Sequence, residues 1–295
     1  MGKAGGQCGR FREKVSEKFG DKYSDKYSGK SSEKLGGKRR SVPERKTVLS
    51  TQPAPYAVAA DLHCHTVAST HAFSTVTELA RAAAQRGLAA VGCTDHAPAM
   101  PDAPHLWHFQ NLKSLPDRIE GVRVLRGAEA NVLGPDGRLD LEAEALQNLE
   151  LVIASMHRQT MPPSSPEECT AAWLAVAANP FVDIIGHSGT PQFAYDYERV
   201  IPEFGRQGKA VEINEGTFRV RKSSVPNCRR IAELCKKHGV FVSLDSDAHF
   251  HGQVGLFPHC RALLREVGFP KELIVNGSVE SLSAFFRRRG RPVSL

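Results

Sequence analysis

The sequence lacks the features that identify membrane, secreted and disulfide-stapled proteins. No apolar run in its 295 residues approaches the roughly 18 residues that a membrane-spanning helix needs. The N-terminus has no apolar segment typical of a secretory signal, and Gly6 stands where N-myristoylation requires Ser or Thr. The seven cysteines are scattered, odd in number and without C-x-x-C spacing, which argues against a disulfide framework. We therefore expect a cytoplasmic protein with no membrane partner.

Two common catalytic signatures are also missing. The chain contains no G-x-S-x-G elbow of the serine hydrolases and no G-x-x-x-x-G-K-[ST] loop of nucleotide triphosphate-binding proteins. Neither nucleophilic-serine hydrolysis nor triphosphate binding by these routes is supported.

The positive charge of the chain is confined to one end. The net charge is +7, but residues 1–50 hold 14 Lys/Arg against 6 Asp/Glu, and the remaining 245 residues hold 25 against 26. Because residues 1–52 are rich in Lys, Ser and Gly and poor in apolar side chains, we expect a disordered basic extension. Residues 56–295 then form the folded domain, and its balanced charge offers no basic surface of the kind that binds nucleic acid. Binding of a polyanion such as nucleic acid remains an alternative for the basic extension, but not for the folded domain.

From about Tyr56, short apolar segments alternate with helical patterns. Seven segments are typical of buried strands: "AVAADLHCH", "LAAVGCTDH", "VRVLRGAEANV", "LELVIASMH", "VDIIGHSG", "AVEINEGTF" and "VFVSLDSDAH". Helices are expected near residues 77–86, 111–120 and 225–238, the last of them ending at Gly239. Apolar strands separated by helices indicate a parallel sheet covered on both faces. Seven such units predict an α/β fold in which the sheet forms a closed or nearly closed β/α barrel, with an open doubly wound sheet as the alternative.

Side chains of the types that bind metal ions follow nearly every predicted strand. His63 and His65 lie two positions apart, as do Asp247 and His249, so each pair projects to one side of its strand. In a β/α barrel the carboxyl ends of the strands meet at one face. Nine side chains are therefore expected around one cavity: His63, His65, His71, His96, Glu129, His157, His187, Asp247 and His249. Imidazole and carboxylate ligands suit Zn²⁺, Mn²⁺ or Fe²⁺, and a set without cysteine argues against a structural zinc–thiolate site.

Several neighbouring side chains have two interpretations each. Asp61, Asp95 and Asp245 either fix the far ring nitrogen of a ligand histidine or serve only as caps and solvated strand ends. His105 and His108 belong either to a pocket rim or to simple packing. His238 is expected at a helix end, outside the chemistry. Further candidates for the pocket lining are Ser188, Asn214, Glu215 and Thr217.

Six short motifs occur together in the order and spacing of a known family. They are "DLHCHTVASTH", "TDH", "GAEAN", "SMH", "GHSG" and "SDAH", and "DAPHLWHF" adds support. On these motifs the chain resembles the PHP (polymerase and histidinol phosphatase) family, most closely its small stand-alone bacterial phosphatases, over residues 58–290. Two departures, Ser188 where proline is more usual and Arg158 directly after His157, leave all nine candidate ligands in place.

The resemblance implies a distorted (β/α)7 barrel that holds three divalent metal ions. Zinc is favoured, with manganese or iron as alternatives. By position, the first ion would take His63, His65, Glu129 and Asp247, the second Glu129, His157 and His187, and the third His71, His96 and His249.

Three clustered dications would create a positive pocket that favours a phosphorylated substrate. The expected enzyme is a metal-dependent phosphoric monoester hydrolase, in which metal-bound hydroxide attacks the phosphorus of a small phosphorylated substrate. Glu129 would bridge the two ions that hold the hydroxide, Asp247 is a candidate proton acceptor, and Arg158 is a candidate clamp for the phosphoryl oxygens. The alternatives are a phosphodiesterase or 3′ exonuclease acting on nucleic acid, and a metal-binding regulatory protein without turnover. A homo-oligomer also stays open.

Overall fold

The computed structural model describes residues 56–162, 164–291 and 293–295, so the predicted extension over residues 1–52 lies outside the described residues. The strands are β1 (Ala60–Asp61), β2 (Ala90–Cys93), β3 (Arg118–Ile119), β4 (Val122–Asn131), β5 (Leu151–Ser155), β6 (Ile184–Ile185), β7 (Ala210–Asn214) and β8 (Val242–Asp245). The α-helices are α1 (Val76–Gln85), α2 (Leu106–Asn111), α3 (Ala143–Gln147), α4 (Pro166–Ala178), α5 (Tyr197–Arg206), α6 (Glu215–Val220), α7 (Val225–His238), α8 (Pro258–Val267) and α9 (Val279–Arg288). Short 3₁₀ turns are η1 (Leu112–Ser114), η2 (Pro191–Phe193), η3 (Lys222–Ser224), η4 (His251–Gln253) and η5 (Lys271–Leu273).

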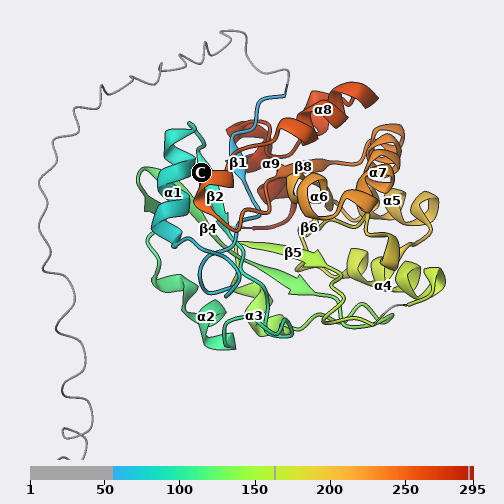
Figure 1. Ribbon diagram of the computed structural model, residues 1–295, viewed down its shortest axis with the longest axis horizontal. Helices are drawn as coiled ribbons and strands as arrows, with labels where there is room; N and C mark the ends of the chain where they lie inside the picture. Colours follow the sequence, from blue (N-terminus) through green and yellow to red (C-terminus); the bar gives the residue numbers. More distant parts are fainter. Residues whose placement is uncertain (1–55, 163, 292) are drawn as a thin grey trace, which may run out of the picture. The chain divides into compact units, whose positions relative to one another are not determined.

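The sheet follows the order of the chain. Its hydrogen-bonded order is β1-β2-β4-β5-β6-β7-β8, every neighbouring pair along this path is parallel, and the short β3 pairs antiparallel with β4. Figure 1 shows α1, α4, α5, α7 and α8 around the outside of the sheet. The seven parallel strands correspond to the seven apolar segments of the sequence, and the α/β prediction is confirmed.

The two outer strands of this sheet meet and close the barrel. Cys64, beyond β1, and Ala248, beyond β8, form a parallel bridge, in which His65 N donates to Ala248 O at 2.8 Å. Nearer the strands, carboxylates replace part of the backbone ladder: Asp61 accepts from Ser246 N at 3.0 Å, and Asp245 accepts from Leu62 N at 2.8 Å. The barrel departs from regular geometry at this point, because side-chain carboxylates take the place of backbone hydrogen bonds between the segments of β1 and β8. The nearly closed, distorted (β/α)7 barrel is therefore confirmed, and the open doubly wound alternative is wrong.

One end of the barrel interior is filled by apolar side chains. Ala90, Leu151 and Ala210, the first residues of β2, β5 and β7, form a buried cluster with Phe285 and Phe286 of α9. Most of the strand residues in this cluster come from strand beginnings, so α9 packs against the amino ends and leaves the carboxyl ends for polar groups.

Local sequence signals set the helix boundaries. Thr75 and Glu78 form a capping box that starts α1, and α7 ends where Gly239 takes the left-handed conformation with φ of 66°. Both agree with the sequence within a residue or two. The helix expected over residues 111–120 is wrong, because Pro116 holds Leu115 in an extended conformation and the preceding helix ends before it.

None of the helices in the part of the chain that the structure covers has both the length and the apolar character needed to cross a membrane.

Candidate active site

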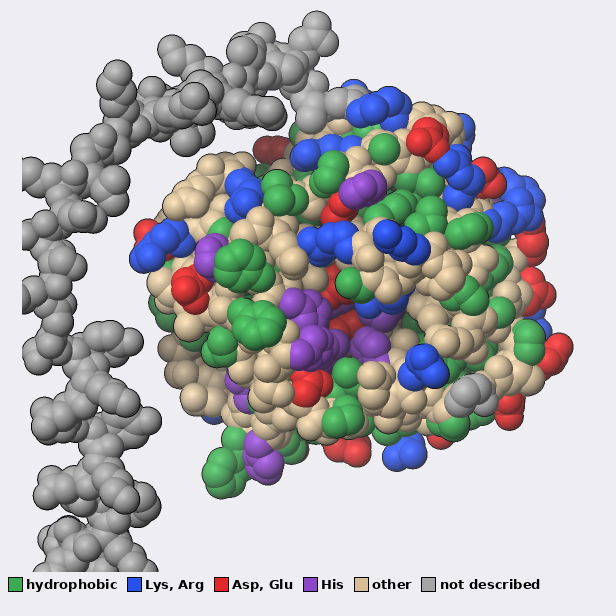
Figure 2. All heavy atoms as spheres, viewed as in Figure 1, with side chains coloured by type: hydrophobic (Ala, Val, Ile, Leu, Met, Phe, Trp, Pro, Cys, Tyr) green, Lys and Arg blue, Asp and Glu red, His purple; other side chains and the backbone are tan. Residues whose placement is uncertain are grey.

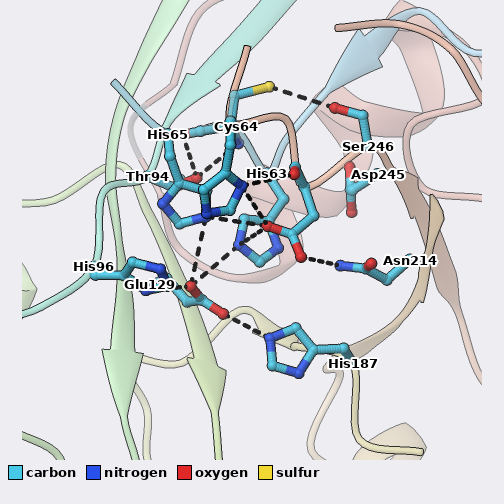
Figure 3. A network of polar contacts seen from close by, with 12 residues as sticks. His63, Cys64, His65, Thr94, His96, Glu129, His187, Asn214, Asp245 and Ser246 are labelled. Carbon is cyan, nitrogen blue, oxygen red and sulfur yellow. Dashed lines mark hydrogen bonds and ion pairs between the residues drawn. The ribbon is translucent and has the colours of Figure 1, made fainter. Parts of the chain in front are cut away.

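The nine predicted metal-ligand side chains come together at the carboxyl ends of the strands. The ring centroids of neighbouring histidines lie close, for example 5.0 Å for His63 and His65, 4.3 Å for His65 and His96, and 4.4 Å for His71 and His249. Figure 3 shows part of this cluster, with Glu129 between the rings of His96 and His187. Residues up to 186 positions apart thus share one site (His63 to His249). Their role as metal ligands stays a prediction.

Glu129 is the centre of the cluster. It lies on β4, is fully buried, and its two oxygens face imidazoles on four other segments. The ring nitrogens nearest to it belong to His96 (2.8 Å), His187 (2.9 Å), His157 (3.3 Å) and His63 (3.4 Å). Burial alone would raise the pKa of Glu129, but these imidazoles, His63 foremost, hold it well below its ordinary value. Glu129 is therefore a carboxylate at neutral pH.

Asp247 is the second buried carboxylate of the site. One oxygen lies 3.2 Å from Nε2 of His65, and the other accepts hydrogen bonds from Arg221 at 2.6 Å and Asn214 at 3.2 Å. Burial would raise the pKa of Asp247, but His63 and the Arg221 guanidinium hold it well below its ordinary value. Such a carboxylate stays ionised and is a poor proton acceptor.

Two of the nine residues have a strained backbone. His187 and Asp247, which follow β6 and β8, have positive φ angles of 22° and 52°, although neither is glycine. Non-glycine residues persist in this region only where the surrounding structure holds them there, and such strain is concentrated at functional sites. Here it turns both side chains toward Glu129 and His65.

Three histidines of the cluster are oriented by polar partners that the sequence analysis missed. Glu212 of β7 lies 2.7 Å from Nδ1 of His63, Asn131 of β4 lies 2.7 Å from Nδ1 of His157, and Asp102 contacts Nδ1 of His71. Such partners fix the tautomer, so that the opposite ring nitrogen can face an ion. The polar residues within the apolar strands "AVEIN" and "GAEAN" were the available signals for Glu212 and Asn131.

The three aspartates proposed for that role do something else. Asp61 accepts from the backbone of Ser246 and Gly255, and Asp245 accepts from the backbone of Leu62. Asp95 accepts from Thr66 and Ser69 and faces His108, which is not one of the nine. For all three, the interpretation as supports of a ligand histidine is wrong: they hold loops and strand ends in place.

The donor set of the site fits divalent metal ions. Buried atoms of His63 (Nε2), His65 (Nδ1 and Nε2), His96 (Nδ1) and Glu129 (Oε2) make no hydrogen bond of good geometry among the described residues, although His96 Nδ1 and Glu129 Oε2 lie only 2.8 Å apart. Unpartnered buried polar atoms are costly, and several that converge indicate a missing ligand. Burial and the neighbouring His96 lower the pKa of His65 to about 3, so this ring is neutral, as a metal ligand must be.

Three sets of residues each bring three ligand atoms within 4.8 Å of one another: His63–His65–Asp247, His96–Glu129–His157 and His65–His96–His249. The first and second resemble two of the sets implied by the family, but His96 lies with Glu129 as well as with His249. His71 and His187 belong to none of these compact groups.

A pocket of about 860 Å³ opens above the cluster. Figure 2 shows purple histidine side chains and red carboxylates at the bottom of a hollow, with blue Lys and Arg side chains on its border. Arg158, Arg219 and Arg221 line this pocket. Sequence analysis found Arg158 but missed Arg219 and Arg221, which follow β7 in "FRVRK" and carry no recognisable spacing.

The other predicted lining residues do not reach this pocket. Ser188 hydrogen-bonds to the hydroxyl of Tyr195, and Glu215 accepts from the backbone of His259 and Cys260. Asn214 caps α6 by accepting from the backbone N–H of Thr217, and its amide donates to Asp247. It therefore helps to hold Asp247 in place without lining the pocket.

His105 and His108 also lie outside this pocket. His105 caps α2 by accepting from Trp107 N at 3.2 Å, and His108 contacts Asp95. His105 is therefore a cap, whereas His108 contacts Asp95 and also lines a separate pocket beside α2. His238 ends α7, as expected.

Comparison with known proteins gives a consistent result. The PHP domain model matches residues 61–216. A probable phosphatase of Clostridium novyi is 44% identical over 232 residues, covering 78% of this chain and 95% of the relative. A probable phosphatase of Acetivibrio thermocellus is 44% identical over 229 residues, covering 78% and 95%.

Among solved structures, the histidinol phosphate phosphatase of Lactococcus lactis, determined with zinc, L-histidinol and phosphate, has a TM-score of 0.51. It is 18% identical, and the match covers 72% of this chain and 95% of that one. At this identity the likeness shows the fold alone.

Proposed function

The chain belongs to the PHP family, and from that premise we propose that it is a metal-dependent phosphatase that hydrolyses phosphoric monoesters of small substrates. The observation that carries the proposal is a buried cluster of His, Glu and Asp side chains with unpartnered atoms, at the bottom of a pocket bordered by arginines. The relatives named probable phosphatases support the reaction class. Residues 56–295 are proposed to carry the activity as one domain.

Three divalent ions are proposed for this cluster, held as the family resemblance implies. His63, His65, Glu129 and Asp247 would hold one, Glu129, His157 and His187 another, and His71, His96 and His249 the third. Zinc is preferred on the imidazole-rich donor set, with manganese or iron as alternatives. When bound, the ions would supply a water of lowered pKa as nucleophile and positive charge for the phosphoryl oxygens.

The residues of the chain have separable tasks in this reaction. Glu129 supplies both of its oxygens to the centre of the cluster, and its lowered pKa keeps them unprotonated. Asp247 is proposed as a ligand rather than as a proton acceptor, because its pKa is held low and one oxygen is occupied by Arg221 and Asn214.

Arg221 is the cation best placed to assist the phosphoryl group. It is largely enclosed, lines the pocket, and is fixed by Asp247 at 2.6 Å and Asn214 at 3.1 Å. A guanidinium held in advance can bind developing charge on phosphoryl oxygens without reorganisation. Arg158, which the sequence offered as a clamp for the phosphoryl oxygens, is exposed and lines the pocket, and a different anion is proposed for it below.

The test compares a monoester with the matching diester. Purified protein is stripped with a chelator, reloaded with Zn²⁺ or Mn²⁺, and assayed on p-nitrophenyl phosphate and bis(p-nitrophenyl) phosphate. Metal-dependent hydrolysis of the monoester is expected. Hydrolysis of the diester alone would replace the proposal with the phosphodiesterase alternative, and hydrolysis of neither would favour a metal-binding protein without turnover.

A further inference from the structure

The three arginines that line the active-site pocket differ in their partners. Arg221 is committed, because Asp247 and Asn214 both accept hydrogen bonds from it. Within residues 56–162, 164–291 and 293–295, Arg219 donates only to a backbone carbonyl, that of Ser246, at 3.1 Å. Arg158 makes no hydrogen bond or ion pair within the described part of the chain, and its side chain is exposed. Two guanidinium groups of the pocket are therefore not neutralised by a carboxylate.

The acidic residues of the pocket cannot neutralise them. The carboxylates in the lining belong to Asp102, Glu129 and Asp247. Asp102 is paired with His71, and the other two are surrounded by the histidine cluster and Arg221. The charge presented to a bound molecule by Arg158 and Arg219 is therefore positive.

The two arginines also come from different parts of the barrel. Arg158 directly follows His157 in the loop after β5, whereas Arg219 lies on α6, after β7. Both line the same pocket, and blue side chains border the hollow on separate sides in Figure 2. Groups that converge from two elements on one pocket can hold one chemical group of a ligand between them or fix two of its oxygens.

The pocket is larger than a phosphoryl group requires. Its volume of about 860 Å³ lies within the range of pockets that enclose whole organic ligands. Its lining includes the apolar side chains of Met100, Met156 and Phe193 and the neutral hydrogen-bonding groups of Gln159 and Gln192. A substrate with a small organic skeleton would therefore extend from the cluster to the two rim arginines.

We propose that Arg158 and Arg219 form a subsite for a second anionic group of the substrate, distinct from the phosphoryl group that is cleaved. The inference rests on the proposed function, since that function assigns the cleaved phosphoryl group to the histidine cluster and Arg221. A guanidinium fork suits a carboxylate or a phosphate, so the substrate class is phosphorylated acids or bisphosphates. In this assignment Arg158 clamps the distal anion and acts as a specificity residue.

The test measures kcat/KM for matched pairs of substrates that differ by one distal anion. Glycerol 3-phosphate is compared with 3-phosphoglycerate, and fructose 6-phosphate with fructose 1,6-bisphosphate, and p-nitrophenyl phosphate reports hydrolysis itself. The first pair adds a carboxylate and the second adds a phosphate, so the pair that shows a preference identifies the anion that the subsite binds. We expect the anion-bearing member of at least one pair to be preferred ten-fold or more by the wild type.

The same ratio is measured in Arg158→Ala/Arg219→Ala, where we expect it to fall at least ten-fold. The double variant Arg158→Lys/Arg219→Lys, which keeps the charge but loses the fork, should give an intermediate ratio. Arg138→Ala, at an exposed arginine that is not among the residues lining the pocket, is the matched control and should keep the wild-type ratio.

Two results would overturn the inference while the proposed function stands: hydrolysis of p-nitrophenyl phosphate with no preference in either pair, or a preference that survives in the double alanine variant. Metal-loaded wild type that hydrolyses none of the five compounds would instead overturn the proposed function, and this subsite with it.

Discussion

Glu212 of β7 and His63, which follows β1, are joined inside the barrel by a 2.7 Å contact between Oε1 and Nδ1. The second oxygen of Glu212 accepts a hydrogen bond from the backbone N–H of His187, also at 2.7 Å. One buried carboxylate therefore orients the first histidine of the cluster and holds the strained residue that follows β6. Supports of this kind tune metal sites strongly, although they do not touch the ion.

Replacing this carboxylate should weaken metal binding. In Glu212→Gln the charge that favours the Nδ1–H form of His63 is lost, and we expect metal affinity to fall about 10- to 100-fold. The measurement is a competition titration against a chromophoric chelator. Glu215→Gln is the control, because that neighbouring buried carboxylate holds His259 and Cys260 instead. Equal affinity in Glu212→Gln and the wild type would contradict this role.

Arg221 should affect turnover rather than metal content. Arg221→Ala removes the guanidinium fixed by Asp247 and Asn214, and we expect kcat for p-nitrophenyl phosphate to fall about 10²- to 10³-fold, as for other preorganised donors to a developing anion. The kcat of Arg221→Lys should lie between those of the wild type and Arg221→Ala, because lysine keeps the positive charge but cannot donate two parallel hydrogen bonds. Elemental analysis of the same samples should show wild-type metal content; loss of metal in parallel with kcat would assign Arg221 to ligand support instead.

Asp183 should be needed for the stability of the barrel. This fully buried carboxylate pairs with Arg291 at 2.9 Å and Arg289 at 3.3 Å, and so ties the end of α9 to the start of β6. Asp183→Asn leaves two enclosed guanidinium groups without a counter-charge, a change that typically costs about 3–5 kcal/mol. Urea denaturation would measure the free energy of unfolding. Asp136→Asn, at an exposed aspartate, should change it little, and a similarly small effect of Asp183→Asn would refute the proposed anchor.

Lys209 should make stability depend on pH. Its ammonium donates to the carbonyls of Asn179 and Val182, and burial together with Arg289 lowers its pKa from 10.5 to about 7, against the opposing effect of Asp183. Between about pH 7 and 10.5 the unfolded chain then holds a proton that the folded chain has released, so this group's contribution to stability rises with pH in that window.

The check compares the wild type with Lys209→Met, which removes the titrating group. The free energy of unfolding of the wild type, relative to that of the variant, should increase between pH 7 and pH 9. A difference that is flat with pH, or that decreases, would show that the lysine keeps its proton in the folded barrel.

The sequence was sufficient for the features that follow from regular geometry. His63, His65, Glu129 and Asp247 could be grouped because they end apolar strands, and parallel strands bring their carboxyl ends to one face. The same regularity predicted α7 and its stop at Gly239. Where regularity ends, prediction failed: the segment before Pro116 is not the expected helix.

The supports of the site depend on contacts that no spacing encodes. Asp61, Asp95 and Asp245 stand beside ligands in the sequence but hold backbone groups, whereas Glu212 lies 149 positions from His63. Arg221, at the end of α6, donates to Asp247, whose backbone takes a positive φ. Only the folded backbone brings these pairs together.

The central claim, a hydrolytic metal site organised around Glu129, is tested most directly by elemental analysis combined with an assay of p-nitrophenyl phosphate hydrolysis. The wild type should contain two to three transition metal ions per chain and lose its activity on chelation. Glu129→Gln should lose metal and hydrolysis together, because four imidazoles converge on this one carboxylate. Wild-type metal content and wild-type hydrolysis in Glu129→Gln would contradict the account.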